Sequence, residues 1–210
     1  MKKRSLTPML TSSTDRRSFL AVLAAGAVAT ALPNPAAAMS EAEANALIGR
    51  VMNDIHGIIN SGASESRMIQ RFEGIFDTYG DVPIIARSAL GPPARAASSS
   101  QMQAFTDAFR GYLSRKYGRQ FRAFIGATVE VTGARELRSF WEVDSTMQLR
   151  GRSPFEVRWH VSDRSGGNRF FNLIIEGVNV LAAERQEIGN MLERRGGDLN
   201  RMIEDLRQAG

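Results

Sequence analysis

The side chains that most often perform catalysis are few in this sequence, and they do not stand in catalytic patterns. Cysteine is absent, which excludes a thiol nucleophile, a disulfide and a thiolate metal site. The two histidines are far apart and have neither a His-x-x-x-His spacing nor a carboxylate at ligand spacing. His160 falls on the polar face of an expected strand, which predicts a solvated ring. His56 follows Ile55 on an expected helix, which predicts a half-buried ring.

Serine and carboxylate side chains remain as candidate catalytic groups. Ser64 and Ser66 are not part of a Gly-x-Ser-x-Gly elbow, and the serine run 98–100 is typical of a loop and a helix N-cap. Glu142 and Asp144 alternate with apolar residues, so both are predicted to face the polar side of a strand. A paired carboxylate of this kind leaves acid–base catalysis open as an alternative without supporting it.

One further carboxylate, Glu176, stands at the end of an apolar run and just before Gly177. Its neighbours Ile174 and Ile175 predict partial burial, and a buried carboxylate without a partner costs several kcal/mol. We therefore expect an arginine or a backbone N–H to bind Glu176, and we expect its role to be structural at a strand-to-helix turn.

The N-terminal segment has the four parts of a bacterial twin-arginine export signal in the right order. A basic start is followed by Arg16-Arg17, by the apolar run Phe19–Leu32 and by the small residues Ala36-Ala37-Ala38. We expect cleavage after Ala38 and a mature protein in the periplasm. An uncleaved membrane anchor is the alternative, but spanning takes about 20 strongly apolar residues, and this run is rich in alanine and broken by Pro33 and Pro35.

Charge argues against a nucleic-acid partner once the signal is set aside. The whole chain carries 27 basic and 22 acidic side chains, and the signal, residues 1–38, holds five of the basic ones and one acidic one. Residues 39–210 therefore keep 22 basic and 21 acidic side chains, too small a surplus for a phosphate-binding surface. These 172 residues are the length of a single domain with a sizeable core.

Apolar residues at helical spacing predict four helices in the first half of the mature chain. Capping boxes at Ser40–Glu43 and Ser100–Gln103 indicate where two of them begin. The expected helices cover approximately residues 41–61, 65–79, 82–90 and 101–125.

After Gly126 the apolar period changes from 3.6 to 2, which indicates strands with one apolar and one polar face. The alternation covers residues 129–132, 141–150, 155–161 and 171–175. Short connections with glycine favour an antiparallel meander of about four strands. Two further helices are expected at 180–195 and 198–208. The predicted fold class is α+β, with N-terminal helices, a one-sided twisted sheet and C-terminal helices.

Three segments give the chain a resemblance to a known family. Phe109–Gly118 looks like a long-helix segment that ends in Tyr-Gly, Phe155–Trp159 looks like a third strand, and Phe171–Val180 is similar to a last strand with its Glu-Gly-Val turn. In this order the mature chain resembles the periplasmic phospholipid-binding carriers of the maintenance-of-lipid-asymmetry system, also called the toluene-tolerance family. Its members often carry a Sec-type signal, so the export route stays open here.

The resemblance implies a carrier without cofactor, metal or catalysis, in which acyl chains enter an apolar pocket between sheet and helices. It implies three partners: a phospholipid, the ring of lipid-binding domains of an inner-membrane ABC transporter, and an outer-membrane lipoprotein–porin complex. Periodicity and resemblance together predict the lipid-binding residues Phe76, Tyr79, Ile85, Leu90, Phe109, Leu113, Tyr117, Phe121, Trp141, Val143, Met147, Val157, Trp159, Phe171, Leu173, Ile175 and Val178.

Two alternatives from other functional classes remain. The first is a small exported α+β enzyme that uses a carboxylate in the same cavity. The second is an envelope interaction module whose large side chains fill an ordinary core, because periodicity alone does not distinguish a filled core from a cavity.

Overall fold

Capping side chains set where the N-terminal helices begin in this computed structural model, which describes residues 38–120 and 124–210. Helix α1 (Glu41–Ile59) starts with the predicted capping box: the Glu43 backbone N–H donates to the Ser40 hydroxyl, and the Ser40 N–H donates to the Glu43 carboxylate. Asp81 accepts a hydrogen bond at the start of α3 (Val82–Leu90). Helix α2 has the bounds that the sequence predicts, Glu65–Tyr79.

The long helix α4 (Ser99–Gly118) begins and ends earlier than the sequence predicts. Its N-cap is Ser98, which forms a capping box with Gln101, so the predicted box two residues later is wrong. The serine run offers both choices of N-cap. A short 3₁₀ turn, η1 (Pro92–Arg95), precedes α4. Its last residue is Gly118, the poorest helix former short of proline.

The strands form a single antiparallel meander, as predicted, with a short fifth strand that the sequence did not reveal. Each strand pairs with the next one along the chain. In order they are β1 (Thr128–Leu137), β2 (Phe140–Gln148), β3 (Phe155–Ser162), β4 (Arg169–Ile175) and β5 (Val178–Asn179).

A β-bulge in β4 decides which aromatic side chains face the helices. The register between β3 and β4 shifts at Val161, so that Phe170 pairs with Val161 and Phe171 is left without an opposite residue. The Phe170 ring turns inward and lies 5.7 Å from Trp159. The Phe171 ring lies 5.7 Å from the His160 ring.

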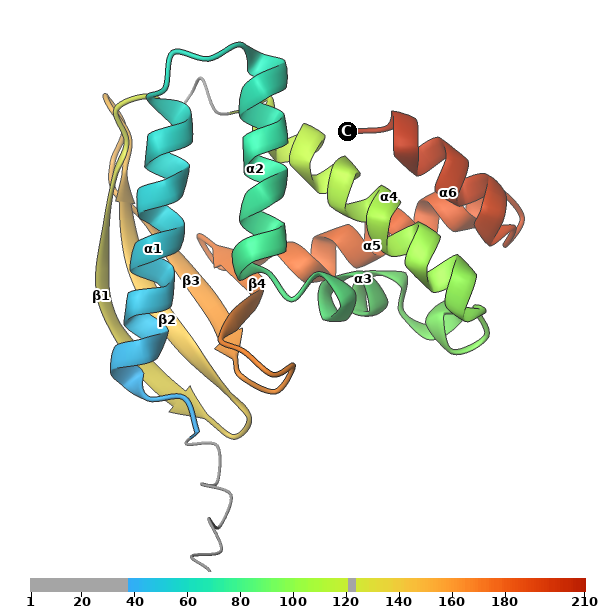
Figure 1. Ribbon diagram of the computed structural model, residues 1–210, viewed down its shortest axis with the longest axis horizontal. Coiled ribbons are helices and arrows are strands. Elements are labelled where there is room, and N and C mark those ends of the chain that lie inside the picture. Colours follow the sequence, from blue (N-terminus) through green and yellow to red (C-terminus); the bar gives the residue numbers. More distant parts are fainter. Residues whose placement is uncertain (1–37, 121–123) are drawn as a thin grey trace, which may run out of the picture. The chain divides into compact units, whose positions relative to one another are not determined.

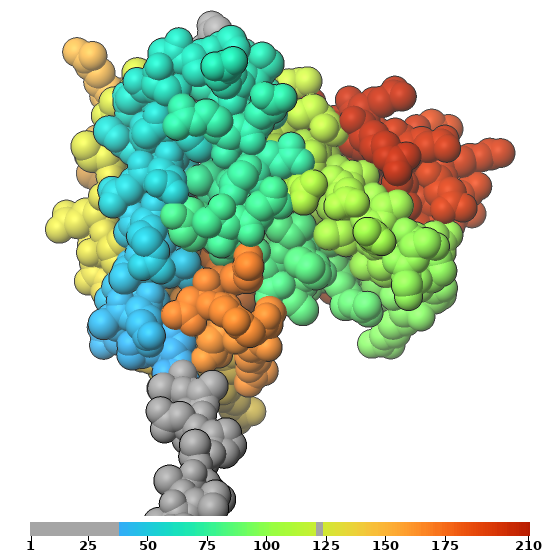
Figure 2. All heavy atoms as spheres, in the orientation of Figure 1, coloured from blue at the N-terminus to red at the C-terminus, as the bar shows by residue number. Residues whose placement is uncertain are grey.

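Figure 1 shows α1 lying along the sheet, α2 beside α1, and α4 and α6 (Leu199–Gln208) farther from the sheet. Helix α1 packs on β1 and β2, α2 packs between α1 and α4, and α3 packs on α5 (Val180–Arg194). Helix α6 packs along α4. Figure 2 shows that the atoms of α1 and α2 abut one another on this side of the domain.

Gly118 allows a close approach between α2 and α4. A Cβ at this position would stand 2.7 Å from Cγ1 of Ile69 on α2. Glycine therefore lets α2 and α4 converge where both border the space in front of the sheet.

No helix within residues 38–120 and 124–210 is long and apolar enough to cross a membrane. The predicted export signal lies outside the described residues except for Ala38, at its expected cleavage point.

Candidate functional site

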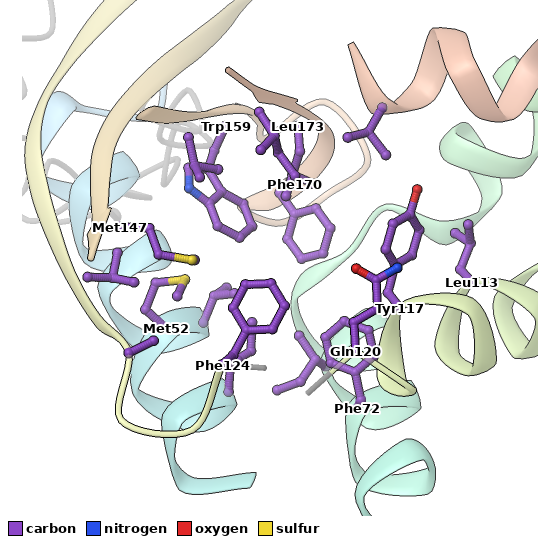
Figure 3. A pocket seen from close by; sticks show the side chains of 18 of the residues that line it. Met52, Phe72, Leu113, Tyr117, Gln120, Phe124, Met147, Trp159, Phe170 and Leu173 are labelled. Carbon is purple, nitrogen blue, oxygen red and sulfur yellow. The ribbon is translucent and has the colours of Figure 1, made fainter. Parts of the chain in front are cut away.

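A cavity of about 760 Å³ lies between the inner face of the sheet and the helices α1, α2 and α4. Its volume is within the range of about 300–1,000 Å³ that is usual for sites of small organic ligands. Figure 3 shows side chains from the helices and from the strands pointing toward one another across this space, among them Phe72, Tyr117, Phe124, Trp159 and Phe170. The interior between sheet and helices is therefore partly open.

Most of the residues predicted to bind an acyl chain line this cavity. They come from α2, α3, α4 and three strands, which are far apart in the sequence and meet only in the folded domain. The predicted residues in the wall are Phe76, Ile85, Phe109, Leu113, Tyr117, Met147, Val157, Trp159, Phe171, Leu173 and Ile175. Phe121 lies outside the described residues.

Five predicted residues do not line the cavity, each for its own reason. Tyr79 donates its hydroxyl hydrogen to a carboxylate of α1. Leu90 is buried at the end of α3, which packs on α5. Trp141 donates its indole N–H to the backbone carbonyl of Met39. Val143 is fully buried on β2, a strand covered by α1, and Val178 is 61% exposed in the last hairpin.

Several lining residues were not among the predicted ones. The apolar stripe of α1 faces the cavity, and its helical spacing was visible in the sequence, but nothing there distinguished a cavity wall from a filled core. Phe170 was missed because the bulge reverses the alternation of β4. The additional apolar lining residues include Val51, Met52, Ile55, Ile59, Phe72, Ile75, Phe124, Val129, Phe155, Phe170 and Leu181.

One buried carboxylate interrupts the apolar wall. Glu184 on α5 is 2% exposed and lines the cavity. Its Oε1 atom accepts hydrogen bonds from Lys116 Nζ at 2.7 Å and from the Tyr117 hydroxyl at 2.5 Å. Lys116 Nζ also donates to the Tyr112 hydroxyl oxygen at 2.9 Å. The cluster ties the end of α4 to α5 at the edge of the cavity.

The pKa shifts in this cluster keep its donors protonated. Burial, reinforced by the hydrogen bond to Glu184, raises the pKa of the Tyr117 phenol far above its ordinary value. Burial opposes the charge of Lys116, but its hydrogen bonds to Glu184 and Tyr112 outweigh that effect and raise its pKa. Tyr117 and Lys116 therefore both act as donors to Glu184 at neutral pH.

Comparison with known protein families assigns the chain to one of them. The sequence pattern of the MlaC protein family matches residues 49–208, which include almost every element around the cavity. The chain belongs to the MlaC family. This confirms the predicted resemblance to the carriers of the lipid-asymmetry system.

A solved structure confirms the fold expected of an MlaC-family chain. It is described as the phospholipid-binding protein from Ralstonia solanacearum in complex with a phospholipid. It matches with a TM-score of 0.69 and 19% identity, over 79% of this chain and 95% of that one. At this identity the likeness shows a common α+β fold.

On the outer face of the sheet, this MlaC-family chain has a buried ionic network where solvated side chains were predicted. Glu142 is only 3% exposed, and its Oε2 atom lies 3.0 Å from His160 Nε2. Arg135 pairs with its other oxygen, and Arg158 lies 3.8 Å away. Asn172 contacts the second ring nitrogen of His160 at 3.3 Å. The prediction of a solvated His160 is therefore wrong, because its cross-strand neighbour is an ionised carboxylate.

Two further predictions for single residues are also wrong. His56 is exposed at the edge of the cavity and not half-buried. Glu176 is exposed, and its carboxylate has no partner among the described residues. Its backbone holds the turn instead: φ is 48° at Glu176 and 81° at Gly177, between the paired residues Ile175 and Val178. The described residues also contain no group of three or more His, Asp or Glu side chains able to hold a metal ion.

Proposed function

We propose that this protein is a carrier that holds a phospholipid by its acyl chains inside the cavity. The observation that carries this proposal is the apolar cavity of about 760 Å³ between sheet and helices. Membership of the MlaC family supports it, as does the phospholipid bound to the structural neighbour of the same fold. The headgroup would remain near solvent at the edge of the cavity.

The energetics of burial suit a carrier that exchanges lipid only at its partners. Each buried methylene contributes about 0.8 kcal/mol against water. Two chains of about 15 methylenes would give roughly 24 kcal/mol, beyond the practical ceiling of about 18–21 kcal/mol for non-covalent binding. Transfer from the cavity to a bilayer is close to neutral, because acyl chains are apolar in both places. Loading and release then need contact with a membrane or a docked protein, and no catalysed reaction.

The same proposal assigns the compartment and the partners. The signal at residues 1–38 would be removed and the domain 39–210 would act in the periplasm. There it would move lipid between an outer-membrane lipoprotein–porin complex and the lipid-binding ring of an inner-membrane ABC transporter, and these partners would set the direction of transport.

Organic extraction of the purified protein tests the proposal directly. We expect phospholipid in the extract at a constant ratio to protein, identified by mass spectrometry. An extract without lipid, from protein that also takes up none from vesicles, would exclude the carrier function and favour an interaction module.

A cavity-filling substitution tests where the lipid lies. Leu173→Trp adds a large ring to the cavity wall, and an open space tolerates it better than a filled core, where overpacking costs about 1–3 kcal/mol. We expect bound lipid to fall severalfold while the far-UV spectrum and cooperative unfolding persist. Ile174→Trp, one residue along β4 and outside the cavity lining, is the matched control and should retain its lipid.

Glu184 keeps the enzyme alternative testable, because it places a carboxylate in the cavity wall. Incubating lipid-loaded protein and following lysophospholipid and free fatty acid separates the two functions. The carrier predicts no product above a blank, whereas an enzyme predicts turnover that Glu184→Gln abolishes.

A further inference from the structure

The position of Glu184 on α5 sets it apart from the other charged residues of that helix. It falls on the apolar stripe of α5, in which Leu181 lines the cavity and Ile188 and Met191 are buried. A carboxylate within an apolar stripe is held there only when other groups compensate its burial. The hydrogen-bond partners of Glu184, and the carboxylate oxygen that has none, therefore indicate its role.

The two carboxylate oxygens of Glu184 are used unequally. Oε1 receives both hydrogen bonds, from Lys116 and from Tyr117. Oε2 is buried and has no hydrogen-bond partner within the described part of the chain. A carboxylate can accept about four hydrogen bonds, so half of the capacity of Glu184 is unused, on a side chain that lines a cavity with mainly apolar walls. A buried acceptor without a hydrogen bond costs free energy, which a ligand that donates a hydrogen bond to it can recover.

The chemistry of the cluster restricts what can bind at Oε2. Lys116 balances the charge of Glu184, and both Lys116 and Tyr117 donate to Oε1 and not to Oε2, while Lys116 also donates to Tyr112. The free position is therefore an acceptor, which attracts an N–H or an O–H group. A quaternary ammonium carries neither. The Lys116 side chain is 35% exposed, so the cluster reaches from the cavity wall to solvent, where the polar end of a bound lipid would lie.

We propose that Glu184 Oε2 selects the lipid headgroup by accepting a hydrogen bond from its donor, either a primary ammonium or a hydroxyl. This inference rests on the proposed carrier function and deepens it. The carrier would then favour ethanolamine and glycerol headgroups over choline headgroups with the same acyl chains.

A competition among three lipids tests the inference in the mature protein. Delipidated protein is incubated with vesicles of phosphatidylethanolamine, phosphatidylglycerol and phosphatidylcholine in equal amounts and with identical chains, then re-isolated and extracted. We expect roughly ten-fold enrichment of a donor-bearing lipid over the choline lipid, the size expected for one hydrogen bond to a charged group. Enrichment of both donor lipids identifies any donor as sufficient, and enrichment of ethanolamine alone identifies the ammonium; either result supports the proposal.

Glu184→Gln is the decisive variant, because its amide oxygen can still accept from Tyr117 and Lys116 while its NH₂ group replaces the free acceptor. We expect the enrichment, measured as the ratio among the bound lipids and so independent of the total amount bound, to fall to near unity. Glu187→Gln, on the same helix but outside the cavity lining, is the control and should keep the wild-type preference. Equal uptake of all three lipids by the wild type, or an unchanged preference in Glu184→Gln, would overturn the inference while leaving the carrier function intact.

A measurement on the wild type covers the case in which Glu184→Gln does not fold. Ethanolamine lipids with one, two or three N-methyl groups lose their N–H donors stepwise at constant charge. Enrichment should persist for the mono- and dimethyl lipids and disappear with the third methyl group. A smooth decline with methyl number would indicate headgroup size and would overturn the inference. Absence of any bound lipid would instead sink the proposed function itself.

Discussion

At the scale of single residues, the outer face of the sheet depends on one carboxylate. Glu142 is buried among Arg135, Arg158 and His160, which come from three neighbouring positions on β1 and β3. Burial alone would raise the pKa of Glu142, but the hydrogen bonds from His160 and Arg135 outweigh it and lower the pKa. The charge of Glu142 therefore contributes to the stability of the sheet.

Glu142→Gln should lower the free energy of unfolding at pH 7 by about 1–3 kcal/mol, because it removes the charge from buried, hydrogen-bonded partners. For a domain of this length we expect the Tm to fall by several degrees in a thermal melt. Glu130→Gln, at an exposed position of β1 with no ion pair among the described residues, is the control and should change the Tm little. An unchanged melt for Glu142→Gln would show that its ion pairs contribute nothing net.

The same network predicts a pH dependence. Because the folded pKa of Glu142 lies below its ordinary value of 4.5, its contribution is fully present above that pH and is lost as pH falls through the folded pKa. The wild-type Tm should therefore decline below about pH 4.5 more steeply than that of Glu142→Gln. Parallel pH profiles for the two proteins would contradict this assignment.

At the scale of elements, the hairpin between β4 and β5 stores local strain. Glu176 has a φ of 48° and Gly177 a φ of 81°, as a type I′ turn of two residues requires. The left-handed conformation disfavours a residue with a long side chain and favours asparagine and glycine. The chain accepts this cost where β4 passes into the first turn of α5, next to the cavity.

Glu176→Asn should relieve this strain and stabilise the protein by about 0.5–1 kcal/mol, since asparagine followed by glycine is a preferred type I′ sequence. We expect a Tm higher by a few degrees. Gly177→Ala is the opposite control and should destabilise by about 1 kcal/mol, because alanine disfavours a positive φ. A lower Tm for Glu176→Asn would mean that the exposed carboxylate has a role of its own.

At the scale of the whole molecule, the start of the described chain is fixed to the sheet. The Met39 backbone N–H donates to Asp163 Oδ2 at 2.9 Å, and its carbonyl accepts from the Trp141 indole N–H at 2.9 Å. Met39 is itself buried. If cleavage falls after Ala38, the new α-amino group of Met39 lies beside the Asp163 carboxylate, where a charged amine forms a stronger hydrogen bond than an amide.

The mature protein should therefore begin at Met39, which intact-mass analysis of periplasmic material would establish.

Replacing Arg16 and Arg17 by lysine should block export if the twin-arginine route is used. Undiminished export would indicate the Sec route, and a full-length chain in the membrane fraction would exclude cleavage.

Asp163→Asn tests the contact of the new N-terminus in the cleaved protein. We expect the free energy of unfolding to fall by about 1–3 kcal/mol, the range for removing a hydrogen bond that involves charged groups. Asp144→Asn, a carboxylate of β2 with no ion pair among the described residues, serves as the control. An equal and small effect of both changes in a urea titration would show that Asp163 does not hold the mature N-terminus.

The sequence by itself determined most of the elements, because caps and apolar periods are local signals. The Ser40–Glu43 box and the starts of α3 at Val82 and of α5 at Val180 all lie where the pattern predicted them. The export signal is equally local, and it stays a prediction. The choice of Ser98 as the N-cap was missed because neighbouring serines offer competing caps.

Only the tertiary structure decided which apolar residues border a cavity and which fill the core. Periodicity gives the inward face of each element but not the distance between faces, so Val143 is packed under α1 while Trp159, on the next strand, lines open space. The bulge that brings Phe170 inward depends on pairing between two strands. Glu184 acquires its partners from a helix 67 residues earlier in the chain. Cavity, bulge and buried carboxylate all arise from contacts between distant segments, which no local pattern encodes.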